Sequence, residues 1–269
     1  KSSIDTDFEK ITLTPLMGSG PYKLGRVDAG RAVSYVRDPN YWGRDLMVNR
    51  GRYNFDMIKF VYYQSDEIAF EGFKSGQYSL HEEKNARNWV TEYNFPALKK
   101  GLVTRYNAKV ATPAANKSFV FNTRKAPFND IHFRQALTYA YDFEWVNKAL
   151  FYNQYIRLQS YFQNSDLAAT GLPSAQESAI LKPYLQQLPP LQRQGVLGQW
   201  KYPVSDASGF NRTNLLNARN ILLKAGYRFK NAQLLDLKGQ PIRIEFLVSD
   251  LAEQPSLLPF VHNLKKLGI

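Results

Sequence analysis

The sequence predicts a mixed α/β fold, and three observations support that prediction. Runs of β-branched and aromatic residues, bounded by Gly and Pro turns, indicate strands. Other segments carry apolar residues at helical spacing and begin with a Ser, Thr or Asp that can cap a helix. The two patterns alternate with short connections, which is typical of a mixed sheet covered by helices.

The first part of the chain is predicted to be rich in strands after an irregular lead-in over 1–20. The expected strands are 20–24, 32–36, 57–63, 78–81 and 102–110, the first two forming a hairpin around the turn 28–30. Ser65 is expected to cap a helix that ends at Gly76. A second helix is expected over 85–93, and it carries Trp89.

Helices are predicted to dominate the second part of the chain, which opens with a strand over 118–122. The expected helices run from Asp130 to Tyr141, from Asp142 to Leu150, from Thr213 to Gly226, and from residue 253 or 256 to 267. A hairpin is expected from strands 234–237 and 242–248. The stretch 153–210 is rich in Gln, Pro, Ser and Gly and is expected to be irregular.

Composition excludes several classes of site. The 269 residues contain no cysteine, which excludes disulfides, thiolate zinc sites, iron–sulfur clusters and a cysteine nucleophile. There is no run of about 18 apolar residues that could span a bilayer. The 35 Lys and Arg exceed the 23 Asp and Glu and give a net charge of +12. Such a charge is typical of nucleic-acid binding, but these residues are scattered, so a basic anion-binding or nucleic-acid-binding domain stays an alternative.

Motifs of catalysis are missing from the sequence. His81, His132 and His262 lie far apart and do not have metal-ligand spacing. The sequence lacks a Gly-x-Ser-x-Gly nucleophile elbow and a glycine-rich phosphate loop. We therefore expect a protein that is not an enzyme and that holds no metal or cofactor.

Aromatic and amide side chains are the better candidates for a binding site. Ligand clefts favour domain junctions, aromatic walls and a few amide groups. The candidate ligand-binding residues, one of them a carboxylate, are Glu83, Asn85, Trp89, Phe121, Asn122, Tyr161, Phe162, Gln163 and Asn164. Core packing is the alternative for each aromatic residue. The strand 118–122 can also hold an extended peptide by backbone hydrogen bonds.

Four motifs in family order resemble the solute-binding proteins of peptide ABC importers, extracellular solute-binding family 5. They are 18–24 (Gly-Ser-Gly-Pro-Tyr-Lys-Leu), 37–42 (Arg-Asp-Pro-Asn-Tyr-Trp), 69–78, and 121–130 followed by 133–137. Ser79 stands where the family usually has Asp. Four further segments are similar to the YejA branch of that family: 48–56, 84–89, 143–153 and 160–164.

The resemblance implies a two-lobed periplasmic-binding-protein-like fold of type II, incomplete at both ends. Residues 1–117 would belong to lobe I, and 118–269 would form the hinge strand and the first part of lobe II. The implied protein is a monomer in the periplasm of a Gram-negative bacterium, with its signal peptide outside this chain. It would capture oligopeptides, or microcin C-type peptide–nucleotides, and deliver them to an inner-membrane ABC permease, without a nucleic-acid partner. The acidic residue that holds a peptide's amine in relatives would lie downstream of this chain.

Overall fold

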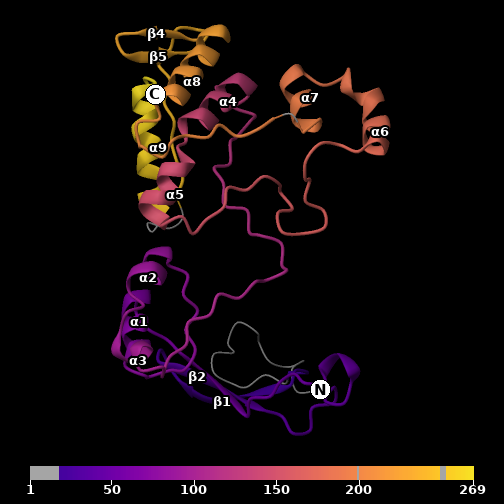
Figure 1. Cartoon of the computed structure of the whole chain (residues 1–269), viewed down its shortest axis with the longest axis vertical. Coiled ribbons are helices and arrows are strands. Elements are labelled where there is room, and N and C mark those ends of the chain that lie inside the picture. Colours follow the sequence, from indigo (N-terminus) through magenta and orange to yellow (C-terminus); the bar gives the residue numbers. More distant parts are fainter. Residues whose placement is uncertain (1–17, 199, 249–252) are drawn as a thin grey trace, which may run out of the picture. The chain divides into compact units, whose positions relative to one another are not determined.

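The computed structural model describes residues 18–198, 200–248 and 253–269, and the chain divides into two compact units (Figure 1). Unit 1 comprises Lys1–Glu83 and Phe95–Val103, and unit 2 comprises Lys84–Asn94 and Thr104–Ile269. Most of the expected lead-in falls on 1–17, outside the described residues. The lobe boundary expected after residue 117 stays a prediction.

A three-stranded antiparallel sheet forms the base of unit 1. Its strands β1 (Tyr22–Asp28), β2 (Ala32–Arg37) and β3 (Met57–Val61) lie in chain order. The hairpin turn closes where the Arg31 amide donates to the Asp28 carbonyl at 2.9 Å. Gly30 has a φ of +73°, a conformation that favours glycine. The predicted hairpin and the predicted third strand are confirmed.

Unit 1 also contains the predicted helix capped by Ser65. This is α1 (Asp66–Lys74), and the Ser65 side chain accepts a hydrogen bond from the Ile68 amide. The short helix α3 (Pro96–Lys99) and a 3₁₀ turn over Met47–Asn49 belong to the same unit. The strand expected over 78–81 does not form. The Tyr78 hydroxyl instead donates to the Ala69 carbonyl of α1 at 2.7 Å, which ties this segment to the helix through a side chain.

Unit 2 contains the predicted helices. They are α2 (Ala86–Thr91), α4 (Ile131–Ala140), α5 (Phe143–Phe151), α8 (Arg212–Lys224) and α9 (Gln254–Lys266). Asp130 and Asp142 cap α4 and α5 as expected, because the Asp130 carboxylate accepts from the His132 amide and that of Asp142 from the Trp145 amide.

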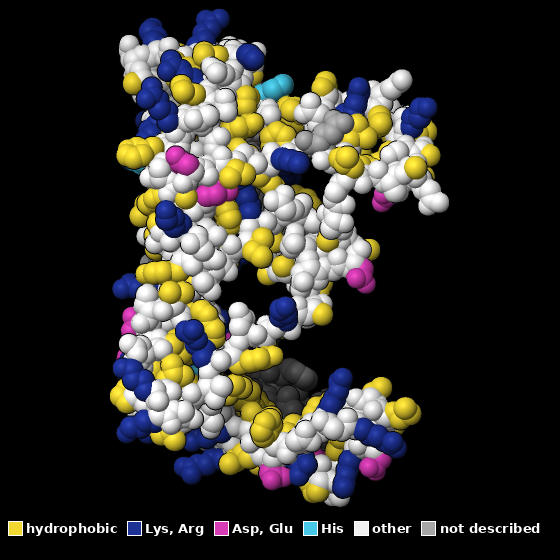
Figure 2. Space-filling view, viewed as in Figure 1, with side chains coloured by type: hydrophobic (Ala, Val, Ile, Leu, Met, Phe, Trp, Pro, Cys, Tyr) yellow, Lys and Arg dark blue, Asp and Glu magenta, His cyan; other side chains and the backbone are white. Residues whose placement is uncertain are grey.

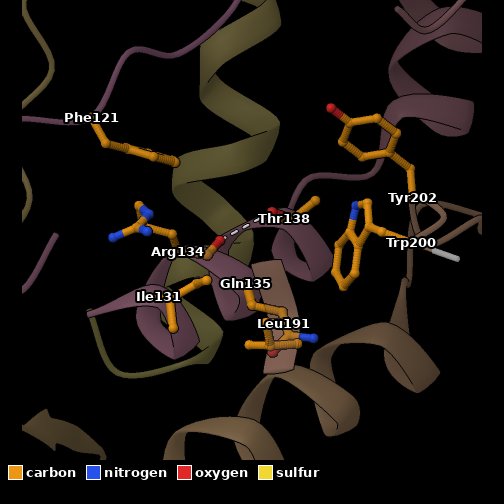
Figure 3. A pocket seen from close by; sticks show the side chains of 8 residues that line it. All are labelled: Phe121, Ile131, Arg134, Gln135, Thr138, Leu191, Trp200 and Tyr202. Atoms are coloured by element: carbon orange, nitrogen blue, oxygen red, sulfur yellow. Dashed lines mark hydrogen bonds between the residues drawn. The ribbon is translucent and has the colours of Figure 1, made fainter. Parts of the chain in front are cut away.

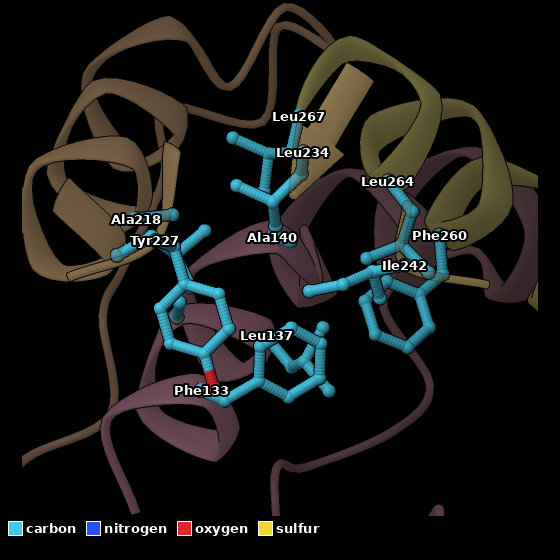
Figure 4. Close-up of a cluster of buried hydrophobic side chains, with 12 residues drawn as sticks. Phe133, Leu137, Ala140, Ala218, Tyr227, Leu234, Ile242, Phe260, Leu264 and Leu267 are labelled. Atoms are coloured by element: carbon cyan, nitrogen blue, oxygen red, sulfur yellow. The ribbon is translucent and has the colours of Figure 1, made fainter. Parts of the chain in front are cut away.

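The hydrophobic core of unit 2 lies where α4, α8 and α9 meet (Figure 4). Its largest fully buried side chains include Phe133 and Leu137 from α4, Leu222 from α8, and Leu234. The ring of Tyr227 stacks on that of Phe133, with 5.7 Å between centroids. Burial of this apolar surface is the main force that holds the helices together.

The segment after α8 forms a different hairpin from the expected one. Strands β4 (Arg228–Lys230) and β5 (Gln233–Leu235) pair with each other. The expected turn at 238–240 does form, with an isolated bridge between Leu235 and Pro241, but 242–248 is not a strand. Pro241 has no amide hydrogen to donate to a continuing ladder.

Two helices occupy the stretch 153–210 that is expected to be irregular. These are α6 (Ala175–Leu185) and α7 (Pro190–Val196). Helix α6 begins with a capping box in which Ser174 and Glu177 satisfy each other's amides. The Ser-x-x-Glu pattern at 174–177, which is a signal for the start of a helix, was therefore present in the sequence.

The prediction of strands over 102–110 and 118–122 is wrong, because neither segment is a strand in the described structure. A strand requires a neighbour that completes its ladder of hydrogen bonds, and neither segment has one among the described residues. The side-chain amide of Asn164 instead donates to the Val110 and Thr112 carbonyls, at 2.9 and 2.7 Å.

Candidate functional site

An open groove of about 250 Å³ in unit 2 brings together three distant parts of the chain (Figure 3). Its lining residues are Phe121, Ile131, Arg134, Gln135, Thr138, Leu191, Trp200 and Tyr202. Four of them, from Ile131 to Thr138, follow helical spacing along one face of α4. Helix α7 contributes Leu191, and the two residues Trp200 and Tyr202 come from the segment after it.

The wall at Phe121 is connected to the hydrophobic core. The ring of Phe121 stacks on Phe128 with centroids 5.4 Å apart and an interplanar angle of 11°, and Phe128 in turn packs edge-on against Phe133. Nη1 of Arg134 donates to the Phe128 carbonyl at 2.7 Å. These contacts fix both side chains on a packed base.

The facing wall consists of Trp200 and Tyr202, whose rings lie across the groove from Phe121 and Arg134 in Figure 3. The Trp200 amide donates to the Gln194 carbonyl at 3.3 Å. The Tyr202 ring lies against the guanidinium of Arg157, with 4.4 Å between the guanidinium carbon and the ring centroid.

The lining suits an apolar or planar ligand group that also carries hydrogen-bonding atoms. Aromatic and aliphatic side chains form most of it, Gln135 adds an amide, and Arg134 adds a positive charge. No carboxylate lines it. Among the described residues, no group of three or more His, Cys, Asp or Glu could hold a metal ion. The described helices are also too short or too polar for any of them to span a bilayer.

Phe121 is the predicted site residue that lines this groove. Its neighbour Asn122 forms a turn, in which its Oδ1 accepts from the amide and from Nε of Arg124, both at 3.3 Å. Asn85 caps α2 by accepting from the amides of Arg87 and Asn88. These two amide side chains therefore have structural roles in the described structure.

Trp89 has a cation as its neighbour. The guanidinium of Arg105 lies 4.5 Å from the Trp89 ring centroid, and its Nη1 donates to the Trp89 carbonyl at 2.7 Å. The Tyr93 ring packs against Trp89 with centroids 5.4 Å apart. This cluster covers part of the indole face that a ligand would stack on.

The segment 161–164 divides into an exposed half and an anchored half. Tyr161 is 85% exposed and Phe162 is 53% exposed. The Gln163 carbonyl accepts from the Ala114 amide at 2.8 Å, and Asn164 donates to two carbonyls near Thr112. The anchored half holds the two exposed rings out toward solvent.

Glu83 belongs to unit 1, where its side chain is 6% exposed and lies 3.4 Å from Nε2 of His81. Nδ1 of His81 is 2.8 Å from the Tyr78 hydroxyl. Burial raises the pKa of Tyr78, and the nearby Tyr63 and Glu83 raise it further. Glu83 is thus part of a buried polar network. A ligand-binding role for the nine predicted residues stays a prediction.

Sequence reasoning missed most of the groove. Arg134 and Gln135 lie within a predicted helix, and helical spacing alone does not distinguish a polar side chain that binds from one that faces solvent. Trp200 and Tyr202 lie near the end of the stretch 153–210, which the sequence predicts to be irregular. Two large aromatic residues two positions apart in a polar segment are a signal that could have identified this wall.

The family model for bacterial extracellular solute-binding proteins, family 5 (middle), matches residues 2–269. Two relatives named YejA are similar to the chain. The uncharacterized YejA of Escherichia coli K12 is 40% identical over 258 residues, which cover 95% of this chain and 42% of that protein. The probable peptide-binding protein YejA of Agrobacterium fabrum is 36% identical, over 98% of this chain and 43% of its own length. The chain thus spans about two fifths of the length of these relatives.

A solved structure is similar in fold. It is the periplasmic oligopeptide-binding protein of an oligopeptide ABC transporter from Thermotoga maritima, with a TM-score of 0.58 and 19% identity. The match covers 94% of this chain and 41% of that structure. This likeness confirms the mixed α/β fold class that the sequence predicts.

Proposed function

Because the chain belongs to the bacterial extracellular solute-binding proteins of family 5, we propose that it is part of the substrate-binding component of an ABC importer. The observation that carries this proposal is the family match, which extends over 2–269. The mixed α/β fold agrees with that family, and the type II binding-protein architecture that the sequence resemblance implies is part of this proposal.

Oligopeptides are the proposed substrate class. The Agrobacterium relative is named a probable peptide-binding protein, and the Thermotoga structure is of an oligopeptide-binding protein. The groove at Phe121 supports this class, because apolar walls suit peptide side chains while Arg134 and Gln135 can donate hydrogen bonds to carbonyl or carboxylate oxygens. Two lobes would close on the peptide about a hinge and present it to an inner-membrane permease.

A microcin C-type peptide–nucleotide is the more specific substrate that we propose. The net charge of +12 favours a ligand with a phosphate group. Figure 2 shows Lys and Arg side chains dispersed over the visible face, where a nucleic-acid binder more often has a stripe. We therefore favour an acidic small ligand over nucleic acid as the partner of this charge.

The proposed protein acts as a monomer in the periplasm of a Gram-negative bacterium and carries out no chemical reaction. This view is supported by the sequence, which lacks the motifs of an activated nucleophile or a metal centre. A peptidase function predicts cleaved products. Intact ligand by mass spectrometry after long incubation is the expected result, and a shortened ligand would overturn this part of the proposal.

Calorimetry on the full-length protein tests the proposed function. The titrants are tri-alanine, a longer defined peptide and a synthetic peptide–adenylate. We expect heat with peptides and tighter binding of the adenylate at low salt. Absence of heat with all three would overturn the importer role, and equal affinity for peptide and peptide–adenylate would overturn the more specific substrate. Binding of duplex DNA that weakens steeply with salt would favour the nucleic-acid alternative.

A further inference from the structure

Arg157 joins the segment after α7 to helix α5, although it does not line the groove. Its guanidinium is close to two rings, 4.4 Å from the Tyr202 centroid and 5.7 Å from that of Phe143. Its Nη1 donates to the Pro203 carbonyl at 2.9 Å. One side chain thus contacts the ring of a groove residue, the backbone next to that residue, and α5.

Ser205 strengthens the same connection. Its amide donates to Oε2 of Glu144 at 3.0 Å, and its hydroxyl donates to Oδ1 of Asp142. Asp142 is 3% exposed and caps α5, so the segment 202–205 is attached to the first turn of a packed helix. The attachment therefore ends at a buried carboxylate.

The charge of Arg157 suits this position. Burial lowers the pKa of its guanidinium, while the carboxylate of Glu144 favours the charged form. Arginine remains charged at neutral pH even when partly buried. Its planar group can stack on Tyr202 and donate to Pro203 at the same time, whereas a lysine ammonium has no flat face to stack.

We infer that Arg157 is the positioning residue for the Trp200–Tyr202 wall of the groove. It holds Tyr202 against α5 and so fixes the separation between this wall and the Phe121 side. The inference rests on the proposed function, in which the groove contacts the ligand. Loss of Arg157 allows Trp200 and Tyr202 to move away from their positions in the groove. The affinity for a ligand with a large apolar side chain then falls more than the affinity for a ligand with a small one.

The experiment compares Arg157→Lys and Arg157→Met with the control Arg219→Met in the full-length protein. Arg219 has the same kind of contact, with its guanidinium 4.7 Å from the Phe229 ring centroid, but it does not line the groove. The first measurement is acrylamide quenching of Trp200, taken as the difference between each protein and its Trp200→Phe counterpart. We expect quenching to rise in both Arg157 variants and to stay unchanged in the control.

The second measurement is the ratio of affinities for Ala-Phe-Ala and tri-alanine by calorimetry. Loss of a cation–π contact and a hydrogen bond is expected to lower the preference for the aromatic peptide about tenfold. Unchanged quenching in both Arg157 variants, or an equal rise in Arg219→Met, overturns the inference. If the unmodified protein binds neither tripeptide, nor the longer peptide and the peptide–adenylate, the proposed function fails, and the quenching measurement still decides the role of Arg157.

Discussion

The hydroxyl of Tyr227 donates a 2.9 Å hydrogen bond to Oδ2 of Asp130, a residue 97 positions earlier in the chain. Oδ1 of the same carboxylate accepts from the His132 amide and caps α4. Asp130 therefore joins the start of α4 to the turn that follows α8. The helix that forms the base of the groove depends on this carboxylate for its first turn.

Asp130→Ala is expected to destabilise unit 2 by about 2 kcal/mol. The cap contributes about 1 kcal/mol, and the buried Tyr227 hydroxyl would lose its acceptor at a similar cost. Asp130→Asn is the matched variant, since its single carbonyl oxygen can still cap the helix while its amide group can donate to the Tyr227 hydroxyl oxygen. Urea unfolding checks the difference, and equal stability of the two variants would contradict the assigned role.

Tyr227 is expected to make the stability of the folded protein fall at alkaline pH. Burial raises the pKa of its phenol above the ordinary value of 10.0, and the hydrogen bond to Asp130 raises it further. A raised pKa in the folded state means that this stabilisation is complete below about pH 10 and is lost as the pH rises above that value. Tyr227→Phe should therefore be less stable than the unmodified protein at about pH 8, and this difference should narrow by about pH 11.

Unfolding free energies at several pH values provide the measurement for Tyr227→Phe. Tyr161→Phe is the control, because that side chain is 85% exposed. A stability difference between Tyr227→Phe and the unmodified protein that stays constant across the alkaline range would contradict the prediction.

Local signals explain why the helices could be predicted from the sequence. Ser65, Asp130 and Asp142 cap helices through contacts that reach only two or three residues along the chain. Such contacts are determined by the nearby sequence. The missed capping box at Ser174 belongs to the same class, so α6 was predictable as well.

Distant contacts explain what the sequence left undetermined. The segment 118–122 has a strand-like composition, but a strand needs a pairing partner that composition does not specify. The groove forms because Phe121 lies on one side of it and Trp200 and Tyr202 lie on the other. The position of Tyr202 depends in turn on Arg157, which donates a hydrogen bond to the neighbouring Pro203 carbonyl. Phe121 was predictable as an aromatic residue near the domain junction, whereas its groove neighbours were not.

Gly209→Ala is expected to destabilise the protein by about 1–3 kcal/mol. Gly209 has a φ of +82°, and an added Cβ would lie 2.6 Å from Nε1 of Trp145. Both backbone strain and the close contact oppose the change. Gly195→Ala is the control, since Gly195 lies in α7 and nothing lies within 4 Å of its added Cβ. That variant should be more stable by about 0.5–1 kcal/mol, as measured by thermal unfolding.

Trp200→Ala is expected to weaken peptide binding by the full-length protein more than about tenfold. Buried or half-buried tryptophans often dominate binding energy, and a loss of about 1.4 kcal/mol corresponds to a factor of ten. Trp42→Ala is the matched control, because Trp42 is 72% exposed and belongs to unit 1.

Calorimetry with Ala-Phe-Ala measures both variants, after urea unfolding has shown that each keeps the stability of the unmodified protein. Trp200→Phe keeps a ring in the wall and should fall between the two, since part of the apolar contact survives. Equal affinity of the Trp200→Ala and Trp42→Ala proteins would show that the groove does not contact the peptide.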